Sequence, residues 1–174
     1  MQHDPATKVL EDFFTPRVAW AFRPTVALHG NDLQAYVVGV LVEFSAAKRM
    51  RKICNSEGRP FSEVTDLLEE SDPVFGSASS FDREWVVRKH LGDLTLFILG
   101  MFPRGAANFH RLPPVRALGD RADLAALGKE SYRVAAAFDQ CEYKEAAPLF
   151  RALSQRFELC VERLHEVARE VHLQ

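Results

Sequence analysis

The sequence predicts an all-α fold, with residues 1–174 forming a single compact bundle of about six main helices. Three observations lead to this prediction. Apolar residues recur at helical spacing along most of the chain, and glycine and proline gather between these stretches. Hydrophobic residues make up 47% of the chain and charged residues 26%, which is typical of globular proteins. A chain of 174 residues can also bury a core without disulfides or a structural metal.

The first element is a short helix expected over residues 5–14. Pro16 and Pro24 are expected to interrupt the chain after it, with room for another short helix between them. Proline has this effect because it lacks the backbone N–H and its ring clashes with the preceding turn.

A longer helix is expected from Leu33 to about Cys54. Asn31 and Asp32 are typical N-cap residues and should begin it. The valine-rich stretch 36–44 fits a strand as well as a helix, but the alanines and basic residues after it favour the helix.

The middle of the chain predicts three more helices. A third, short helix is expected over 60–70 and a fourth over 82–102, which Pro103 and Gly105 should end. Apolar residues surround the second half of the fourth helix on every side, so we expect it to be the central and most buried one. A fifth helix is expected over 120–138.

The sixth and last helix is expected from residues 146–148 to about Val171, and it carries the most regular pattern of the chain. Its apolar residues are spaced alternately three and four apart, which is a heptad seam. We expect this seam to pack inside the bundle. The seam consists of Phe150, Leu153, Phe157, Cys160, Leu164, Val167 and Val171.

A second apolar stripe lies beside this seam. Leu159, Val161 and Ala168 widen the apolar surface of the last helix to one side. Two stripes on one helix suggest two partners, and a two-fold homodimer through the C-terminal helix is therefore expected.

Composition and charge exclude several classes of function. Twenty-two basic and 24 acidic residues give a net charge of −2, which does not fit a general nucleic-acid-binding protein. The longest apolar runs, 35–42 and 94–102, are too short for a membrane span of roughly 20 residues. The first residues do not resemble a signal peptide, and Cys54, Cys141 and Cys160 have no pairing pattern, so a cytoplasmic location is expected.

The strongest site candidates lie on the fourth and fifth helices. His90 and Asp93 share a face of the fourth helix, and a buried carboxylate there needs a partner. Tyr132 and Arg133 bring a hydroxyl and a guanidinium to the fifth helix. One interpretation is a structural ion pair of the Arg133–Asp93 type, and the other is the polar floor of a ligand pocket.

Three glycines predict that these two helices approach each other closely. Gly92 and Gly100 lie in the fourth helix and Gly128 in the fifth. Glycine costs about 1 kcal/mol relative to alanine inside a helix, so it is typical of places where another backbone or a ligand comes near.

The segments HLGDLTLFILGMFP and GKESYR carry a resemblance. They are similar to the GDxxLFxxGxFP and GxxSYR motifs of an uncharacterised family of all-helical bacterial proteins. The resemblance covers roughly residues 85–170. It implies that the two segments form one paired structural unit, and it implies no activity.

The connection 103–119 is long for a compact domain and contains no acidic residue. Arg104, His110, Arg111 and Arg116 lie in it. This combination predicts a site for an anionic small ligand.

The sequence predicts no catalytic residue, metal site or cofactor. Glu162 and His165 have the spacing used by di-iron bundles, but no second such pair exists. No zinc, phosphate-binding or nucleophile motif is present.

The function expected from the sequence is that of a non-enzymatic cytoplasmic protein that binds a small ligand or a protein partner. One alternative is an enzyme with a pocket between the helices 82–102 and 120–138 and the 103–119 loop. The other alternative is a metal- or haem-binding helical bundle.

Overall fold

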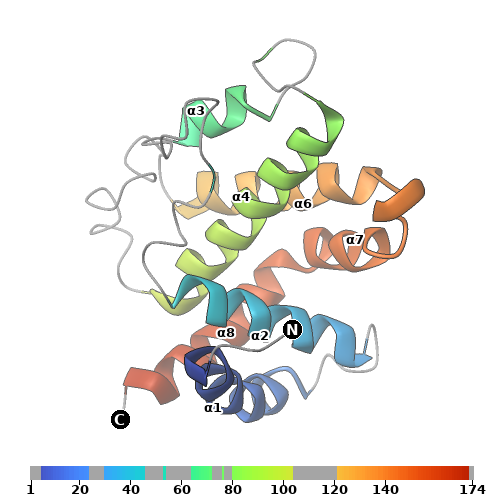
Figure 1. The fold of residues 1–174 in the computed structure, drawn as a ribbon. Coiled ribbons are helices and arrows are strands. Elements are labelled where there is room, and N and C mark those ends of the chain that lie inside the picture. The colour runs from blue at the N-terminus through green and yellow to red at the C-terminus, as the bar shows by residue number, and fades with distance from the viewer. Residues whose placement is uncertain are drawn as a thin grey trace.

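The computed structural model describes residues 5–23, 30–45, 53, 64–71, 76, 80–103 and 121–172. These residues form an all-α fold without strands, as the sequence predicts (Figure 1). The helices are α1 (Pro5–Ala21), α2 (Gly30–Phe44), α3 (Val64–Glu69), α4 (Phe81–Met101), α6 (Arg121–Ala137), α7 (Ala147–Gln155) and α8 (Phe157–His172), with the 3-10 helix η3 (Cys141–Tyr143) before α7.

Helix α1 continues through Pro16, so the prediction that this residue interrupts the chain is wrong. Phe14, Val18 and Ala21 lie on both sides of the proline and are all buried. Their packing offsets the cost of a proline inside a helix, which is about 3 kcal/mol. Pro24 lies outside the described residues.

Residues 36–44 form a helix, which settles the choice between helix and strand. Helix α2 ends at Phe44, however, well before the predicted end at Cys54. Directly after it, the Ser45 hydroxyl donates to the Leu41 carbonyl at 2.7 Å, a local bond that competes with continuation of the helix. Of the third predicted helix, Val64–Glu69 is helical and residues 60–63 are not described.

The predicted last helix consists of two helices, α7 and α8, which are separated at Arg156. The backbone of Arg156 has φ −122° and ψ 24°, outside helical geometry. The apolar seam nevertheless keeps its phase across the junction, because six of its seven residues, Phe150 to Val167, are buried. The expectation that the seam packs inside the bundle is confirmed.

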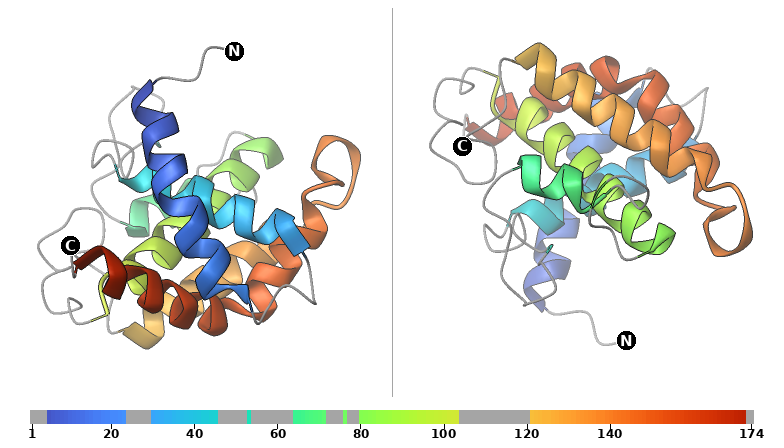
Figure 2. Two further views of the ribbon diagram at one scale, coloured as in Figure 1. Left: turned by 90° about the horizontal axis from the view of Figure 1, so that it is seen from below. Right: turned by 90° about the horizontal axis from the view of Figure 1, so that it is seen from above.

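Helix α4 is the central helix, as its apolar sequence predicts. Every residue from 90 to 101 is buried. Helix α6 makes the most extensive contact with α4, and α8 also packs against α4 while α7 packs against α6. Seen from below, α1 and α2 lie in front of α4, and the end of α8 lies beside α1 (Figure 2).

The glycines of α4 and α6 are places of close approach, as expected. A Cβ atom on Gly92 would lie 2.6 Å from the Tyr132 ring, and one on Gly100 would lie 2.5 Å from Leu164. A Cβ atom on Gly128 would lie 2.5 Å from the hydroxyl of Thr95. The absence of side chains at these positions therefore sets the spacing of α4 from α6 and α8.

Helix α3 packs on α4 through a small apolar cluster that is separate from the main core. The cluster consists of Ile53, Leu67, Val87 and Leu91. Beside it, the Arg83 guanidinium donates to Glu70 at 2.9 Å and connects the start of α4 to the segment that follows α3.

Candidate functional site

Asp93 lies at the centre of a buried hydrogen-bonded cluster. Its carboxylate accepts from the Tyr36 hydroxyl at 2.5 Å and from the Tyr132 hydroxyl at 2.8 Å. The Lys89 ammonium, one turn earlier on α4, donates to its second oxygen at 2.6 Å. We call these four residues the Asp93 cluster. They connect α2, α4 and α6 at a side chain that is only 3% exposed.

The two tyrosines act as neutral donors. Burial, followed by the neighbouring charge of Asp93, raises the pKa of Tyr36 and of Tyr132 well above the ordinary value of 10. Both hydroxyls therefore stay protonated and donate to the carboxylate at neutral pH. The partners of Asp93 come from three helices, so the cluster holds these helices together as a structural feature of the core.

The structure brings only some of the predicted site residues together. Asp93 and Tyr132 are hydrogen-bonded, whereas Arg133 is exposed and donates to Glu130 at 2.6 and 2.7 Å. The predicted Arg133–Asp93 ion pair is therefore wrong. Neighbouring residues point about 100° apart on a helix, and here Tyr132 is turned into the core whereas Arg133 is turned to the surface. His90 is buried, with its ring 5.6 Å from that of Phe44.

The cation that pairs with Asp93 was visible in the sequence. Lys89 precedes Asp93 by four residues, a spacing that brings opposite charges together on a helix. The contribution of Tyr36 was not visible, because it comes from another helix 57 residues away.

The residues of the predicted anion site lie outside the described residues. This applies to Arg104, His110, Arg111 and Arg116. An anionic ligand at the 103–119 loop therefore remains a prediction.

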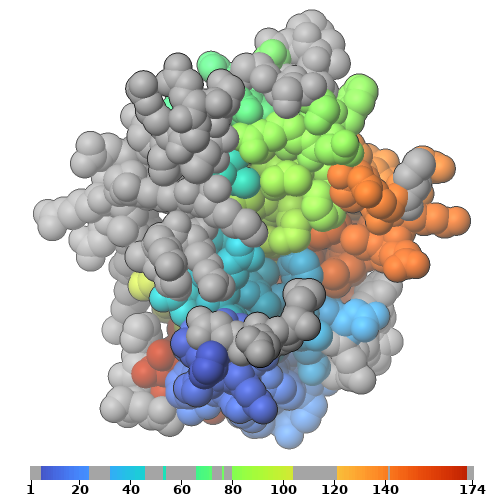
Figure 3. Space-filling model, in the orientation of Figure 1, coloured from blue at the N-terminus to red at the C-terminus, as the bar shows by residue number. Residues whose placement is uncertain are grey.

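A groove lies between the start of α4, the end of α6 and the η3 segment. Its volume is about 590 Å³, within the usual range for small-molecule sites. On the face of the molecule shown in Figure 3, the green residues of α4 lie against the orange residues that follow α6. The side chains that line the groove are Phe81, Asp82, Glu84, Arg133, Val134, Ala137, Phe138, Gln140, Glu142 and Tyr143.

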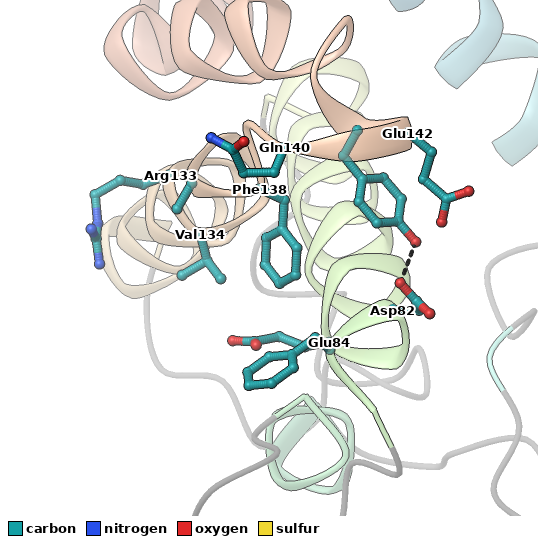
Figure 4. Close-up of a pocket in the computed structure, with 10 residues that line it drawn as sticks. Asp82, Glu84, Arg133, Val134, Phe138, Gln140 and Glu142 are labelled. Atoms are coloured by element: carbon teal, nitrogen blue, oxygen red, sulfur yellow. Dashed lines mark hydrogen bonds between the residues drawn. The ribbon is translucent and has the colours of Figure 1, made fainter.

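Aromatic rings form part of the groove wall. The ring of Phe138 points from the end of α6 towards Glu84 on α4 (Figure 4). It lies 5.9 Å from the Tyr143 ring at an angle of 86°, so the two rings form a corner. Phe81, at the start of α4, is 65% exposed although it is a large apolar side chain.

Tyr143 is held in place from two sides. Its hydroxyl donates to Asp82 at 2.9 Å (Figure 4). Its ring stacks on Trp85 with centroids 4.5 Å apart. Desolvation and the bond to Asp82 raise the pKa of Tyr143 above its ordinary value, so the hydroxyl remains a donor. Contacts within the protein therefore fix this wall of the groove.

A continuous row of aromatic rings joins the groove to the Asp93 cluster. Trp85, which stacks on Tyr143, contacts Phe150 with centroids 5.7 Å apart. Phe150 in turn contacts the rings of Tyr36 and Tyr132 at 5.6 and 5.8 Å. The groove wall and the buried carboxylate thus rest on the same packed rings.

The alternative of an enzyme with a pocket between the helices 82–102 and 120–138 and the 103–119 loop stays a prediction, because residues 104–119 are not among those described. The groove lies at residues 81–84 of α4, whereas the 103–119 loop follows the other end of that helix. Residues 138–143, which complete the groove, carry Phe138, Glu142 and Tyr143 within a short connection. This concentration of aromatic and acidic residues is the signal that could have indicated the site.

No group of three or more histidine, cysteine, aspartate or glutamate side chains with the geometry of a metal site occurs within the described part of the chain. His165, which the sequence paired with Glu162, forms a 2.9 Å hydrogen bond with the Leu99 carbonyl. It thereby satisfies a carbonyl near the end of α4 that the helix itself leaves without a partner.

Comparisons with protein-family models, with curated proteins and with solved structures find no match for this chain. The resemblance to a family of helical bacterial proteins therefore remains a prediction.

Proposed function

We propose that this protein is a non-enzymatic helical protein that binds a small molecule in the groove between α4, α6 and η3. The observation that carries this proposal is the groove itself, with a volume of about 590 Å³, aromatic walls and a polar rim. Sites for small molecules usually combine an apolar lining with a few placed polar groups.

The side chains of the groove favour binding over covalent catalysis. Among the lining residues that the structure describes, none is a serine, cysteine, histidine or lysine. These described side chains therefore form neither of the pairs, Ser–His or Cys–His, that generate an activated nucleophile. Its aromatic and acidic groups can hold a ligand without reacting with it.

A pair of alanine substitutions on α6 tests this proposal. Ala137 lines the groove and is exposed, so Ala137→Phe should fill the groove without disturbing the core. Ala126→Phe is the matched control, because Ala126 is exposed on the same helix and does not line the groove. Native mass spectrometry should detect small molecules carried through purification, and ligand-observed NMR should detect binding of 2-phenylethanol, phenethylammonium and phenylacetate.

We expect binding of at least one molecule to the native protein and to Ala126→Phe, and much weaker binding to Ala137→Phe. Equal binding to both variants would place the site elsewhere. Absence of any binding to the native protein would overturn the proposal.

Two further parts of the proposal concern the setting of the protein. We propose that it works in the cytoplasm, in agreement with a buried, unpaired thiol at Cys160. We also propose a homodimer, whose mass light scattering can measure. None of the helices described has the length and apolar character of a membrane span.

A further inference from the structure

We propose that the ligand of the groove is an organic cation, an ammonium group attached to an apolar or aromatic body. This inference rests on the proposed function and specifies the chemical class of the ligand. It follows from the combination of acidic side chains with aromatic rings around one cavity of about 590 Å³.

Charge is the first argument. Among the lining residues that the structure describes, Asp82, Glu84 and Glu142 carry carboxylates and Arg133 carries a guanidinium. Arg133 donates two hydrogen bonds to Glu130, which offsets its charge. It also points away from Asp82 and Glu142 (Figure 4). The groove therefore favours a cation over a neutral molecule and disfavours an anion.

The rings are the second argument. The face of an aromatic ring carries a partial negative charge and attracts a cation within about 6 Å. Phe138 and Tyr143 form a corner at 86°, and Phe81 is largely exposed at the start of α4. A cation in this corner would contact ring faces and lie near carboxylates, whereas the apolar part of the ligand would contact Val134 and Ala137.

Three probes of similar size separate charge from shape. They are phenethylammonium, 2-phenylethanol and phenylacetate, which carry a positive, zero and negative charge on the same phenylethyl or benzyl body. Trp85 reports binding, since it stacks on Tyr143 in the groove wall. The chain has two tryptophans, and Trp20→Phe removes the other, exposed one, which leaves Trp85 as the only indole emission. Isothermal titration calorimetry gives the affinities independently.

We expect phenethylammonium to bind about tenfold more tightly than 2-phenylethanol, and phenylacetate to bind most weakly. Raising the salt concentration should weaken binding of the cation and leave that of the alcohol unchanged, because salt screens exposed charges.

Two sets of variants assign the preference to the groove. Asp82→Asn with Glu142→Gln should bring the affinity for phenethylammonium close to that for 2-phenylethanol, while the asparagine can still accept from Tyr143. Asp12→Asn with Glu69→Gln makes the same change in net charge at exposed positions outside the groove and should keep the preference.

Phe138→Leu should weaken binding of the cation more than that of the alcohol, because leucine keeps an apolar wall without a ring face. Circular dichroism confirms that each variant is folded.

The outcomes separate this inference from the proposed function. Equal or tighter binding of 2-phenylethanol, blocked by Ala137→Phe, would overturn the cation inference and leave the binding function intact. A preference for the cation that is unchanged in Asp82→Asn with Glu142→Gln would also overturn it. Failure of all three probes to bind by calorimetry, together with the absence of any copurified small molecule in native mass spectrometry, would overturn both.

Discussion

At the scale of single residues, Asp93 shows how a charge can be tolerated in the centre of a bundle. The carboxylate is stable there because it accepts hydrogen bonds from Tyr36, Tyr132 and Lys89. The two hydroxyls are donors that lose little when buried, since each finds a charged acceptor. Lys89 is 29% exposed and retains contact with water. Removal of Asp93 therefore affects the tyrosines more than the lysine.

The first prediction concerns Asp93 and Tyr132 as a pair. Asp93→Leu should lower the free energy of unfolding by about 2–3 kcal/mol, because it removes the charged acceptor of the fully buried Tyr132 hydroxyl. Tyr132→Phe alone should cost about 1–2 kcal/mol. In the Asp93→Leu background, however, Tyr132→Phe should cost almost nothing. Urea unfolding of the two single variants and the double variant measures this coupling, and strictly additive effects would contradict it.

The second prediction concerns alkaline pH. Burial raises the pKa of Cys160 to about 12 from an ordinary value of 9.0, and burial together with Asp93 raises the pKa of Tyr36 and Tyr132 well above 10. The native state thus retains protons that the unfolded chain releases. The contribution of these three groups to the free energy of unfolding should be constant below about pH 8.5 and fall as the pH rises towards 12. Urea titrations across this range test it.

Cys160→Ala provides the control for this pH dependence. The variant should start from a lower stability because it leaves a small cavity, yet lose less stability between about pH 9 and pH 12 than the native sequence. Parallel curves for the two proteins would show that the thiol does not contribute.

At the scale of helices, the position of α4 depends on small residues along its length and on donors at its end. Gly92 and Gly100 allow close contact with Tyr132 and Leu164. Beyond them, the Leu99 carbonyl accepts from the Arg121 guanidinium at 3.1 Å and lies 2.9 Å from the His165 ring. Side chains of α6 and α8 thus satisfy the carbonyl end of α4, which carries no basic residue in its own last turn.

The third prediction compares two glycines in helices. Gly128→Ala should lower the free energy of unfolding by about 1–3 kcal/mol, since the new methyl group would overlap Thr95 and the Phe157 ring. Thr95 cannot move away easily, because its hydroxyl donates to the carbonyls of Leu91 and Gly92. Gly39→Ala is the control: nothing lies within 4 Å of its Cβ position, and it should stabilise α2 by about 0.5–1 kcal/mol. Thermal unfolding measures both changes, and stabilisation by Gly128→Ala would contradict the close crossing.

The sequence allowed the helices and their burial to be predicted because these depend on local periodicity. The ends of α4 and α6 agree with prediction to about one residue, and the buried seam of α7 and α8 was recognisable from its spacing. The course of the chain at Pro16 and at Arg156 was predicted wrongly. At Pro16 the helix continues, because tertiary packing overrides the local preference of proline. At Arg156 the helix is interrupted, although the regular apolar pattern runs across this residue. The groove was missed because its walls combine residues 81–84 with residues 133–143, a pairing that only the folded chain creates.

At the scale of the whole molecule, the second apolar stripe of α8 has a partner within the same chain. Val161 and Ala168 are both buried and belong to the main core. Helix α1 packs against α8, so the chain itself covers apolar surface that suggested a second subunit. The homodimer stays a prediction, and Val161 and Ala168 are not available to its interface because both are buried within the chain.

The fourth prediction follows from this burial. Ala168→Glu should unfold the protein rather than give a folded monomer, because it forces a carboxylate into a fully buried position. Glu162→Lys changes the charge at an exposed position of the same helix and should leave the fold intact. Circular dichroism reports folding, and light scattering of the native protein reports its mass. A folded Ala168→Glu variant would mean that this face of α8 is not covered by the chain.

The separate apolar cluster under α3 has a consequence for how the molecule opens. Helix α3 has only six residues, too few to persist alone in water, so it depends on the packing of Leu67 and on the Glu70–Arg83 pair. These contacts can break while the crossing of α4 and α6 remains closed. Amide hydrogens of residues 67–69 should then exchange with deuterium through a local opening, at a lower free energy than those of residues 94–99, which exchange only when the whole chain unfolds.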